Sequence, residues 1–294
     1  MKLSQSHRKI AADLGLMGIC VIWGTSFAIV KTVVGEINPA AFIAVRFVIA
    51  ALIIGLMSIK RFRNMSTELW LAGFLAAVPL MAGFLVQTAG VKLTTASKAG
   101  FITGMHVIFT PFLSWIVLKR RPTAYQVIGI AVAVVGLGLL TLEDFGMPSV
   151  GDLLVLACAF AFSVHMVMLA RLSPRYDGFL LSFAQMAGAA ALAGVVAGPD
   201  LAQAASFGRD VWMSVLYLGA AGTAIAYLVQ TIAQRYTPPI RAAIIMQLEP
   251  VFAAVFAWLL IGERMDMRQY AGAALILAGI LVCQIGDAKK TVEV

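Results

Sequence analysis

Long apolar runs separated by short charged clusters dominate the chain. Eight runs contain no Asp, Glu, Lys or Arg, and two more are interrupted once, 37–59 by Arg46 and 242–262 by Glu249. A helix needs roughly 20 apolar residues to cross a bilayer core of ~30 Å, where an unpaired backbone group is costly. The pattern therefore predicts ten membrane-spanning helices. The eight uninterrupted runs are 14–30, 69–91, 99–118, 122–142, 153–170, 178–199, 211–234 and 269–286.

The composition agrees with this interpretation. Of the 294 residues, 61% are hydrophobic and only 12% are charged, and the mean hydropathy is +0.94, whereas a soluble domain carries about 25% charged residues. Outer-membrane strands alternate apolar and polar positions over about ten residues, but these runs are apolar on every side. We therefore expect an all-α integral membrane protein, with no stretch left for a soluble domain.

The loop charges predict the orientation in the membrane. If the N-terminus is inside, fifteen Lys and Arg residues lie on the inner side and six on the outer side, and Lys and Arg mark cytoplasmic loops. Both termini are thus expected in the cytoplasm, in a bacterial inner membrane. The net charge of +8 then reflects topology, and no nucleic-acid partner is expected because a nucleic-acid binder concentrates its basic residues on one face. The basic N-terminus resembles that of a signal peptide, but no A-x-A-like cleavage site follows, so an uncleaved first span is expected.

The second half of the chain repeats the first. At an offset of 143 residues, fourteen of the 55 positions from Leu85 to Leu139 are identical, and the segment 85–88 recurs as 228–231. At an offset of 139, Asp13 matches Asp152, Trp23 aligns with Phe162, and Pro39 with Gly178. The predicted domains are a five-helix repeat over 12–142 and a second over 151–286, with cytoplasmic tails at 1–11 and 287–294. Because five is odd, the second repeat enters from the other side, and such inverted repeats are typical of secondary transporters with a midplane substrate site.

Two sequence motifs resemble a known family. The segment Trp23-Gly24-Thr25-Ser26-Phe27, with Lys31, Pro39 and Arg46, resembles the first half of an EamA-type repeat, and the segments 249–252 and 260–264, with Gly272, resemble the end of the second. These are marks of the drug/metabolite transporter superfamily. The resemblance implies a ten-helix bundle of two inverted halves that exports small metabolites. The first repeat departs from the pattern, because His106-Val107 stands where the second has Glu249-Pro250.

The size, topology and aromatic-rich, acid-poor interior are most similar to the YddG branch of that superfamily. This resemblance implies export of aromatic and other hydrophobic amino acids. No cofactor, metal or ATP-driven step is expected, since the chain has no G-x-x-x-x-G-K-[ST], H-E-x-x-H or G-x-S-x-G motif.

Polar residues inside spans are costly, so each is a candidate functional residue. Glu249 is the only acid in the middle of a span, and Pro250 after it is expected to kink the helix and free the carbonyl of Met246. Glu249 is predicted to face a cavity as a proton carrier or a contact for a substrate amine; the alternative is a buried acid that is protonated or paired for packing. His106 holds the equivalent position in the first repeat, where a satisfied core histidine is the alternative.

Further polar and aromatic residues join these two. Gln87 and Gln230 recur in the repeat, each three residues after an aromatic side chain, and suit either a zwitterionic ligand or contacts between helices. Trp23, Phe27 and Phe162 predict an aromatic wall or contacts with a neighbouring helix. The predicted substrate-binding residues are Trp23, Phe27, Phe84, Gln87, His106, Phe162, His165, Tyr227, Gln230, Gln247 and Glu249.

Other intramembrane residues are interpreted as structural. Arg46 could bind a substrate carboxylate, but it lies seven residues after Pro39, so its side chain is expected to snorkel to the outer interface. Gly129 with Gly136, and the equivalent pair Gly272 with Gly279, place small residues on one helical face. They predict a packing seam between the fifth and tenth spans.

The leading hypothesis is a secondary transporter that exports a small amphiphile, with aromatic or other hydrophobic amino acids as substrates. It would work by alternating access about a midplane cavity, with the lipid bilayer as its environment and protons as a candidate coupling ion. Two alternatives remain: an intramembrane enzyme acting on a lipid or polyprenyl substrate, and a non-transporting scaffold subunit.

Overall fold

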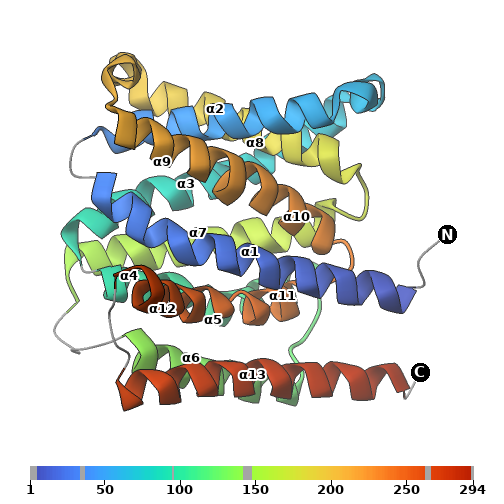
Figure 1. Ribbon diagram of the computed structural model, residues 1–294. Helices are drawn as coiled ribbons and strands as arrows, with labels where there is room; N and C mark the ends of the chain where they lie inside the picture. Colours follow the sequence, from blue (N-terminus) through green and yellow to red (C-terminus); the bar gives the residue numbers. More distant parts are fainter. Residues whose placement is uncertain (1–4, 34–36, 95, 142–147, 262–265, 293–294) are drawn as a thin grey trace.

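The structure, a computed structural model, describes residues 5–33, 37–94, 96–141, 148–261 and 266–292, and the regular structure in these ranges is helical (Figure 1). The first repeat contains α1 (Gln5–Val33), α2 (Pro39–Met57), the short η1 (Ile59–Asn64), α3 (Thr67–Leu93), α4 (Ala96–Gly104), α5 (His106–Leu118) and α6 (Ala124–Thr141). The second contains α7 (Val150–Leu172), α8 (Gly178–Ala197), η2 (Gly198–Ser206), α9 (Arg209–Gly219), the π-helical η3 (Ala220–Ile225), α10 (Ala226–Ala233), α11 (Pro239–Ile245), α12 (Leu248–Ile261) and α13 (Met267–Val292).

These helices confirm the predicted all-α membrane fold. Within the described residues, seven helical stretches are long and apolar enough to cross a membrane, and α6 and α13 contain shorter apolar stretches. The remaining span, predicted over 242–262, is formed by α11 and α12 in succession. Spans 99–118 and 211–234 are also built from successive helices, α4 with α5 and α9 with η3 and α10.

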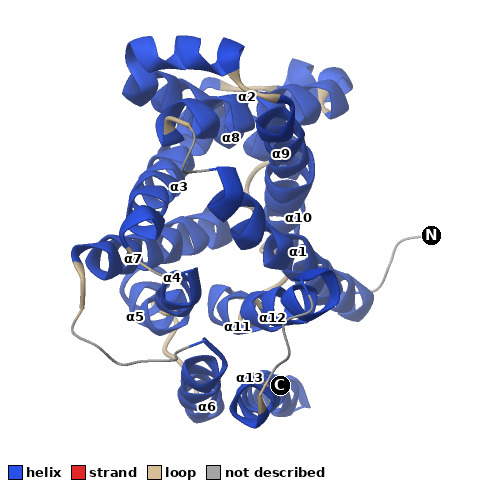
Figure 2. Ribbon diagram, turned by 60° about the vertical axis from the view of Figure 1, so that its left-hand side comes forward, coloured by secondary structure: helices blue, strands red, loops and turns tan. Residues whose placement is uncertain are grey.

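The packing of the helices follows a two-fold relationship between the repeats. In Figure 2, α3 and α7 pack together on one side of the bundle, and their counterparts α10 and α1 on the other. Likewise α5 packs on α7 as α12 packs on α1, while α2 pairs with α8 and α6 with α13. Each helix thus has the same neighbours as its counterpart, as expected for two inverted five-helix repeats.

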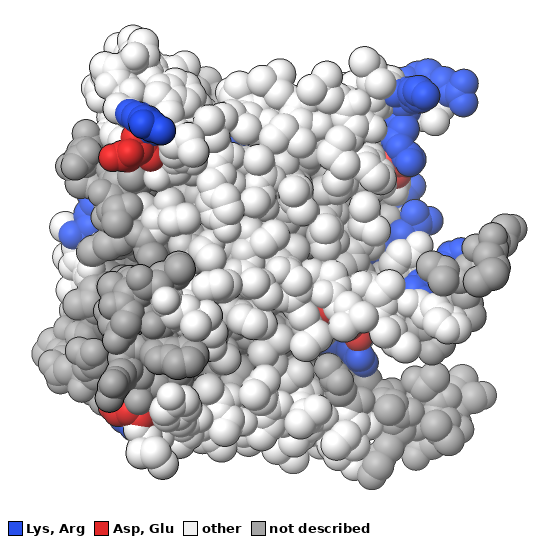
Figure 3. All heavy atoms as spheres, viewed as in Figure 1, with Lys and Arg blue, Asp and Glu red and all other residues white. Residues whose placement is uncertain are grey.

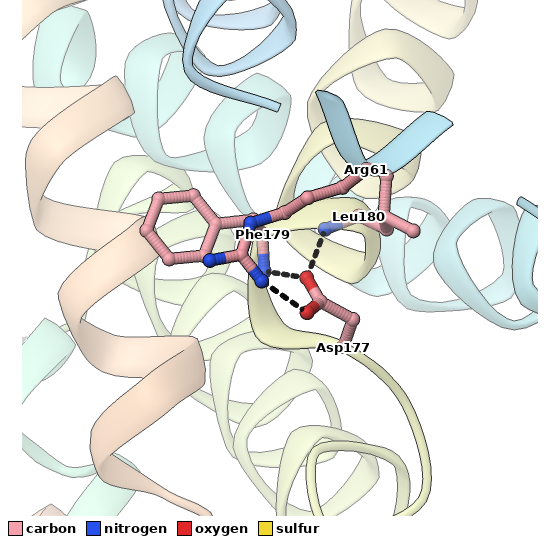
Figure 4. A network of polar contacts seen from close by, with 4 residues as sticks. All are labelled: Arg61, Asp177, Phe179 and Leu180. Carbon is pink, nitrogen blue, oxygen red and sulfur yellow. Dashed lines mark hydrogen bonds and ion pairs between the residues drawn. The ribbon is translucent and has the colours of Figure 1, made fainter. Parts of the chain in front are cut away.

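The cap of α8 shows the two-fold relationship in single contacts. Asp177 accepts hydrogen bonds from the N–H groups of Phe179 and Leu180, and Arg61 of η1 binds the same carboxylate at 2.7 Å while lying 4.5 Å from the centroid of the Phe179 ring (Figure 4). Such side-chain caps satisfy N–H groups that a helix start leaves unpaired.

The same arrangement recurs at the start of α2. Asn38 caps α2 through the N–H groups of Ala40 and Ala41, and its side-chain amide donates to Asp200 of η2 at 2.7 Å. The offset of 139 residues pairs Asn38 with Asp177 and Arg61 with Asp200. Equivalent residues thus make equivalent contacts at the two caps, which supports the offset of 139 residues for the first two helices of each repeat.

The surface divides into a lipid-facing belt and two polar edges. The N-terminal end of α1 and the C-terminal end of α13 lie at the right-hand edge of Figure 1, called the terminal edge below. Figure 3 shows Lys and Arg side chains gathered along this edge and a broad band without charges beside it. Large apolar side chains such as Leu52, Leu56, Ile116 and Val195 are 63, 71, 64 and 81% exposed, which suits contact with lipid.

The fourth span of each repeat is broken between two helices. The break between α4 and α5 is at Met105, and the break between α11 and α12 is at Met246 and Gln247. The prediction that the Met246 carbonyl is free is wrong, because it accepts a hydrogen bond of 3.1 Å from the N–H of Glu249. Pro250 has no N–H to donate to this carbonyl, and the tighter turn brings the N–H of Glu249 to it instead.

The glycine seam between α6 and α13 is confirmed. A Cβ atom at Gly136 would lie 2.6 Å from the carbonyl oxygen of Gly272, and one at Gly129 would lie 2.7 Å from that of Gly279. The two backbones approach too closely for any side chain at these positions. These four glycines therefore hold the fifth and tenth spans together by close packing.

Candidate functional site

A cavity of about 100 Å³ that opens at a mouth lies between the two repeats. Of the predicted residues, the aromatic side chains Trp23, Phe84, Phe162 and Tyr227 line it. So do the polar side chains Gln87, His106, His165, Gln230 and Glu249.

The aromatic residues form a continuous wall. The Phe84 ring lies 5.5 Å from that of Phe162 and 6.2 Å from that of Tyr227, which in turn lies 5.5 Å from Trp23. These separations are typical of tilted and edge-to-face pairs. Both alternatives for Trp23 are realised, since its ring lines the cavity and its indole N–H also binds the Gly222 carbonyl at 2.9 Å.

The π-helical turn η3 supplies this carbonyl. The N–H of Ala226 bonds the carbonyl of Ala221, five residues earlier, so the helix is locally widened. Single π turns inside α-helices are frequent at functional sites. Gly222, inside this turn, presents its carbonyl to the side chains of both Trp23 and Arg46.

The expectation that Arg46 snorkels to the outer interface is wrong. Its side chain lines the cavity and is only 5% exposed. The guanidinium donates to the Thr223 hydroxyl at 2.5 Å and to the Gly222 carbonyl at 3.4 Å, and it lies 4.9 Å from the centroid of the Phe84 ring. Because α2 packs on η3, which offers these acceptors, the charge turns inward; among the described residues the hydrogen-bond partners of Arg46 are neutral.

His106 and Glu249 stand at the starts of α5 and α12, where the two broken spans meet the cavity. Nδ1 of His106 lies 3.0 Å from the Thr103 carbonyl, and a carbonyl only accepts, so Nδ1 carries a hydrogen. In a neutral ring Nε2 is then an acceptor, and this buried atom has no partner among the described residues. Glu249 brings a carboxyl group to the same cavity.

The glutamines take different roles. Gln87 donates to the Thr103 hydroxyl at 3.2 Å, and the buried oxygen Oε1 of Gln230 has no partner among the described residues. His165 is hydrogen-bonded through Nε2 to Oε1 of Gln185 at 2.9 Å. Unpartnered acceptors beside a cavity are positions where a ligand donor can bind.

Two predicted residues are not placed in the cavity. Gln247 joins the two broken spans instead, donating to the Gly104 carbonyl at 2.9 Å. The side chain of Phe27 lies outside those that the structure describes. Ser26, Thr88 and Thr103 also line the cavity and were not predicted from the sequence. A hydroxyl in an apolar span does not by itself indicate a cavity, because it commonly bonds a carbonyl of its own helix. Thr88 makes such a bond with the Phe84 carbonyl.

Comparison with known proteins identifies the family. The model of the EamA-like transporter family matches the chain twice, over residues 10–142 and 149–284. The chain belongs to this family. It is 31% identical over 283 residues to an uncharacterized transporter of Archaeoglobus fulgidus, covering 96% of this chain and 88% of the relative. It is 24% identical to the uncharacterized transporter YyaM of Bacillus subtilis, covering 90% and 91% of the two chains.

A solved structure supports the fold. A chain titled only "Crystal structure of protein" matches with a TM-score of 0.78 at 19% identity, covering 93% of this EamA-like protein and 96% of that chain. The family and its relatives are transporters, so this chain is a multi-pass membrane transporter and not an enzyme. The hypothesis of a lipid-modifying enzyme is thereby excluded.

Proposed function

We propose that this EamA-like transporter exports small amphiphilic metabolites, with aromatic and other hydrophobic amino acids as its substrates. One observation supports this substrate class above others: Arg46 and Glu249, of opposite charge, line one cavity whose wall is aromatic. This fits the resemblance to the YddG branch, which stays a prediction.

The polar groups suit the two ends of an amino acid. The Arg46 guanidinium has neutral partners, so a substrate carboxylate would supply the missing opposite charge. Glu249, the oxygen of Gln230 and Nε2 of His106 are acceptors for an ammonium group. Phe84, Phe162 and Tyr227 provide ring contacts for an aromatic side chain.

The charge distribution and the position of the cavity support the direction of transport. The Lys and Arg side chains along the terminal edge favour a cytoplasmic location of both termini, in a bacterial inner membrane. Besides its centre, the cavity is lined by Val30 and Val91, near the ends of α1 and α3 that face away from the terminal edge. Export would load the substrate from the terminal edge and release it through the mouth seen in this conformation, with protons as the proposed coupling ion.

Transport assays in proteoliposomes test this proposal. We expect efflux of radiolabelled tryptophan, phenylalanine and leucine. Efflux of tryptamine, which lacks the carboxylate, and of 3-indolepropionate, which lacks the ammonium group, should be at least about tenfold slower. Each analogue leaves one charged group of the cavity without its partner, and an uncompensated charge inside a membrane protein is costly. Protein-free liposomes are the control. If no labelled amino acid moves under any imposed gradient, the proposed function is wrong.

A matched pair of variants tests the carboxylate contact. Arg46→Gln removes the cavity charge, and we expect tryptophan efflux to fall by ~100-fold while the ratio of tryptamine to tryptophan rises, because a charge-assisted bond is worth roughly 1.5–3 kcal/mol. Arg61→Gln removes an arginine that is on η1, away from the cavity, and should leave both values near those of the parent. An unchanged tryptamine ratio in Arg46→Gln would contradict the role of Arg46.

A further inference from the structure

The centre of the cavity is two-fold symmetric in its residues. Six pairs of positions that are equivalent in the two repeats both line it, among them Trp23 with Phe162, Phe84 with Tyr227, and His106 with Glu249. A site built from matching positions of two inverted repeats lies at the midplane of the membrane. The inward-open and outward-open conformations of such a transporter are arranged around this site. The central part can thus contact a substrate in either conformation.

Apart from Met166 of the second repeat, the remaining lining residues lie on one side. Val30, Phe42, Ile43, Arg46, Thr88 and Val91 line the cavity toward the edge opposite the terminal edge, and all six belong to the first repeat. Their counterparts in the second repeat are at most 3% exposed and line no part of the cavity. These counterparts, called the closed layer below, are Leu169, Leu181, Ser182, Gln185, Thr231 and Gln234.

The closed layer lies between the cavity and the terminal edge. It comes from the last turn of α7, the first turns of α8 and the end of α10, and α8 begins at Gly178 beside the cap formed by Asp177 and Arg61. Any path from the central cavity to the terminal edge between these helices has to pass through it.

Side-chain hydrogen bonds hold the closed layer together. Gln185 donates to the Thr231 hydroxyl at 2.8 Å and its Oε1 accepts from Nε2 of His165 at 2.9 Å, while Gln234 donates to the Met166 carbonyl at 3.1 Å. These bonds connect α7, α8 and α10.

Among the described contacts, the equivalent residues of the first repeat do not bond each other. Arg46, the counterpart of Gln185, bonds Thr223 and not Thr88. Thr88 and Thr231 each also bond the carbonyl four residues earlier in their own helix. The side-chain bond from Gln185 to Thr231, which joins α8 to α10, therefore has no described counterpart between α2 and α3, which meet through the rings of Phe47 and Phe84.

Two polar atoms of the closed layer lack partners among the described residues. They are the hydroxyl of Ser182 and Oε1 of Gln234, and both are buried. A buried polar group without a partner is costly, and it becomes satisfied when water or a polar ligand enters. These atoms support an arrangement in which the layer lines a hydrated path.

We infer that the closed layer is the second half of the substrate pathway. In the other conformation of the transporter it opens to the terminal edge, and Val30, Arg46, Thr88 and their neighbours pack together. This inference rests on the proposed transport by alternating access. Breaking the bonds of Gln185 to Thr231 and His165 opens it, and the amide of Gln185 then lines the path where Arg46 does now. A substrate carboxylate accordingly meets a neutral donor on the terminal side and a guanidinium on the other.

Cysteine labelling at one equivalent pair of positions tests the inference. Ser182→Cys places a thiol in the closed layer, and Ile43→Cys places one at its counterpart in the open half. A membrane-impermeant maleimide is applied to either face of the membrane, and protease digestion of an N-terminal tag identifies the face at the terminal edge. The parent protein, whose three cysteines are buried, gives the baseline rate.

During transport of tryptophan we expect Ser182→Cys to react from the terminal edge about tenfold faster than the parent, and Ile43→Cys to react from the opposite face. A Ser182→Cys protein that transports but is labelled only at the parental rate would overturn the inference. Should this variant fail to fold, Thr231→Cys and its counterpart Thr88→Cys decide in the same way.

The assay separates this inference from the proposed substrate. If the parent moves none of the amino acids, the substrate proposal is wrong. Labelling of Ser182→Cys from the terminal edge without added substrate would still support the closed layer, because spontaneous exchange between conformations exposes it.

Discussion

Gln247 donates a hydrogen bond of 2.9 Å to the carbonyl of Gly104, and these residues hold the same position in the two repeats, 143 residues apart. A residue that contacts its own counterpart lies at the pseudo-two-fold axis. The bond joins the breaks in the fourth and ninth spans, next to His106 and Glu249. A Cβ atom at Gly104 would lie 3.2 Å from Oε1 of Gln247, so little room is left for a larger residue at this contact.

Gln247→Leu should therefore weaken the centre of the bundle. The substitution leaves the buried Gly104 carbonyl without its donor, which costs about 1–3 kcal/mol of unfolding free energy. Equilibrium unfolding in mixed detergent micelles measures this cost. Gln203→Leu, on the exposed η2, is the control and should change stability by less than about 0.5 kcal/mol. Equal stability of Gln247→Leu and the parent would show that the bond contributes nothing.

The sequence predicted the spans because charges in a membrane protein are confined to loops, and the two interrupted runs still proved to be helical. The repeat predicted the inversion, since an odd number of spans reverses the second copy. The π turn η3 was not predictable. Its residues, Ala220 to Ile225, include Gly222 and Thr223 among alanines, as other apolar spans of this chain do, and the widening is visible only in the bond from Ala226 to Ala221.

Polar residues inside spans, with the aromatic residues singled out beside them, predicted nine of the nineteen residues that line the cavity, because a buried polar group needs a reason to be there. The distance of Arg46 from the end of its own helix predicts snorkelling, but it says nothing of acceptors on other helices. The acceptors of Arg46, Thr223 and Gly222, are more than 170 residues away in the chain, and only the packing of α2 on η3 brings them close. Gln247 has the same chemistry as Gln87 but points to the other repeat, which spacing does not reveal.

The glycine seam predicts a large contrast between two similar substitutions. Gly136→Ala places a Cβ atom 2.6 Å from the Gly272 carbonyl oxygen and 2.8 Å from the backbone N of Ile276, so α6 and α13 must separate, at about 1–3 kcal/mol. At Gly18 of α1, a Cβ atom meets nothing within 4 Å, and Gly18→Ala should gain about 0.5–1 kcal/mol from helix propensity. Unfolding midpoints of the two variants check this, and a fall of equal size in both would contradict the seam.

The paired caps predict equal effects in the two repeats. Asp177→Ala and Asn38→Ala each remove the side-chain oxygen that binds two N–H groups of a helix start, and each should cost about 1 kcal/mol. Arg61→Ala and Asp200→Ala remove only the second, solvent-exposed partner of each cap, and should cost less than about 1 kcal/mol. Unfolding free energies for the four variants test this order. Equal losses for Arg61→Ala and Asp177→Ala would show that the ion pair, which both substitutions remove, and not the cap holds the start of α8.

Glu249→Gln tests the proposed proton coupling. The amide keeps the size and the hydrogen-bonding oxygen of the side chain but cannot take up or release a proton. If Glu249 carries the proton, tryptophan efflux driven by a proton gradient should fall by about tenfold or more and lose its dependence on pH, whereas exchange of tryptophan for tryptophan should continue. Glu68→Gln, in the exposed first turn of α3, is the matched control and should behave as the parent. An unaltered rate and pH profile in Glu249→Gln would remove this residue from the coupling step, while loss of both driven efflux and exchange would assign Glu249 to substrate binding instead.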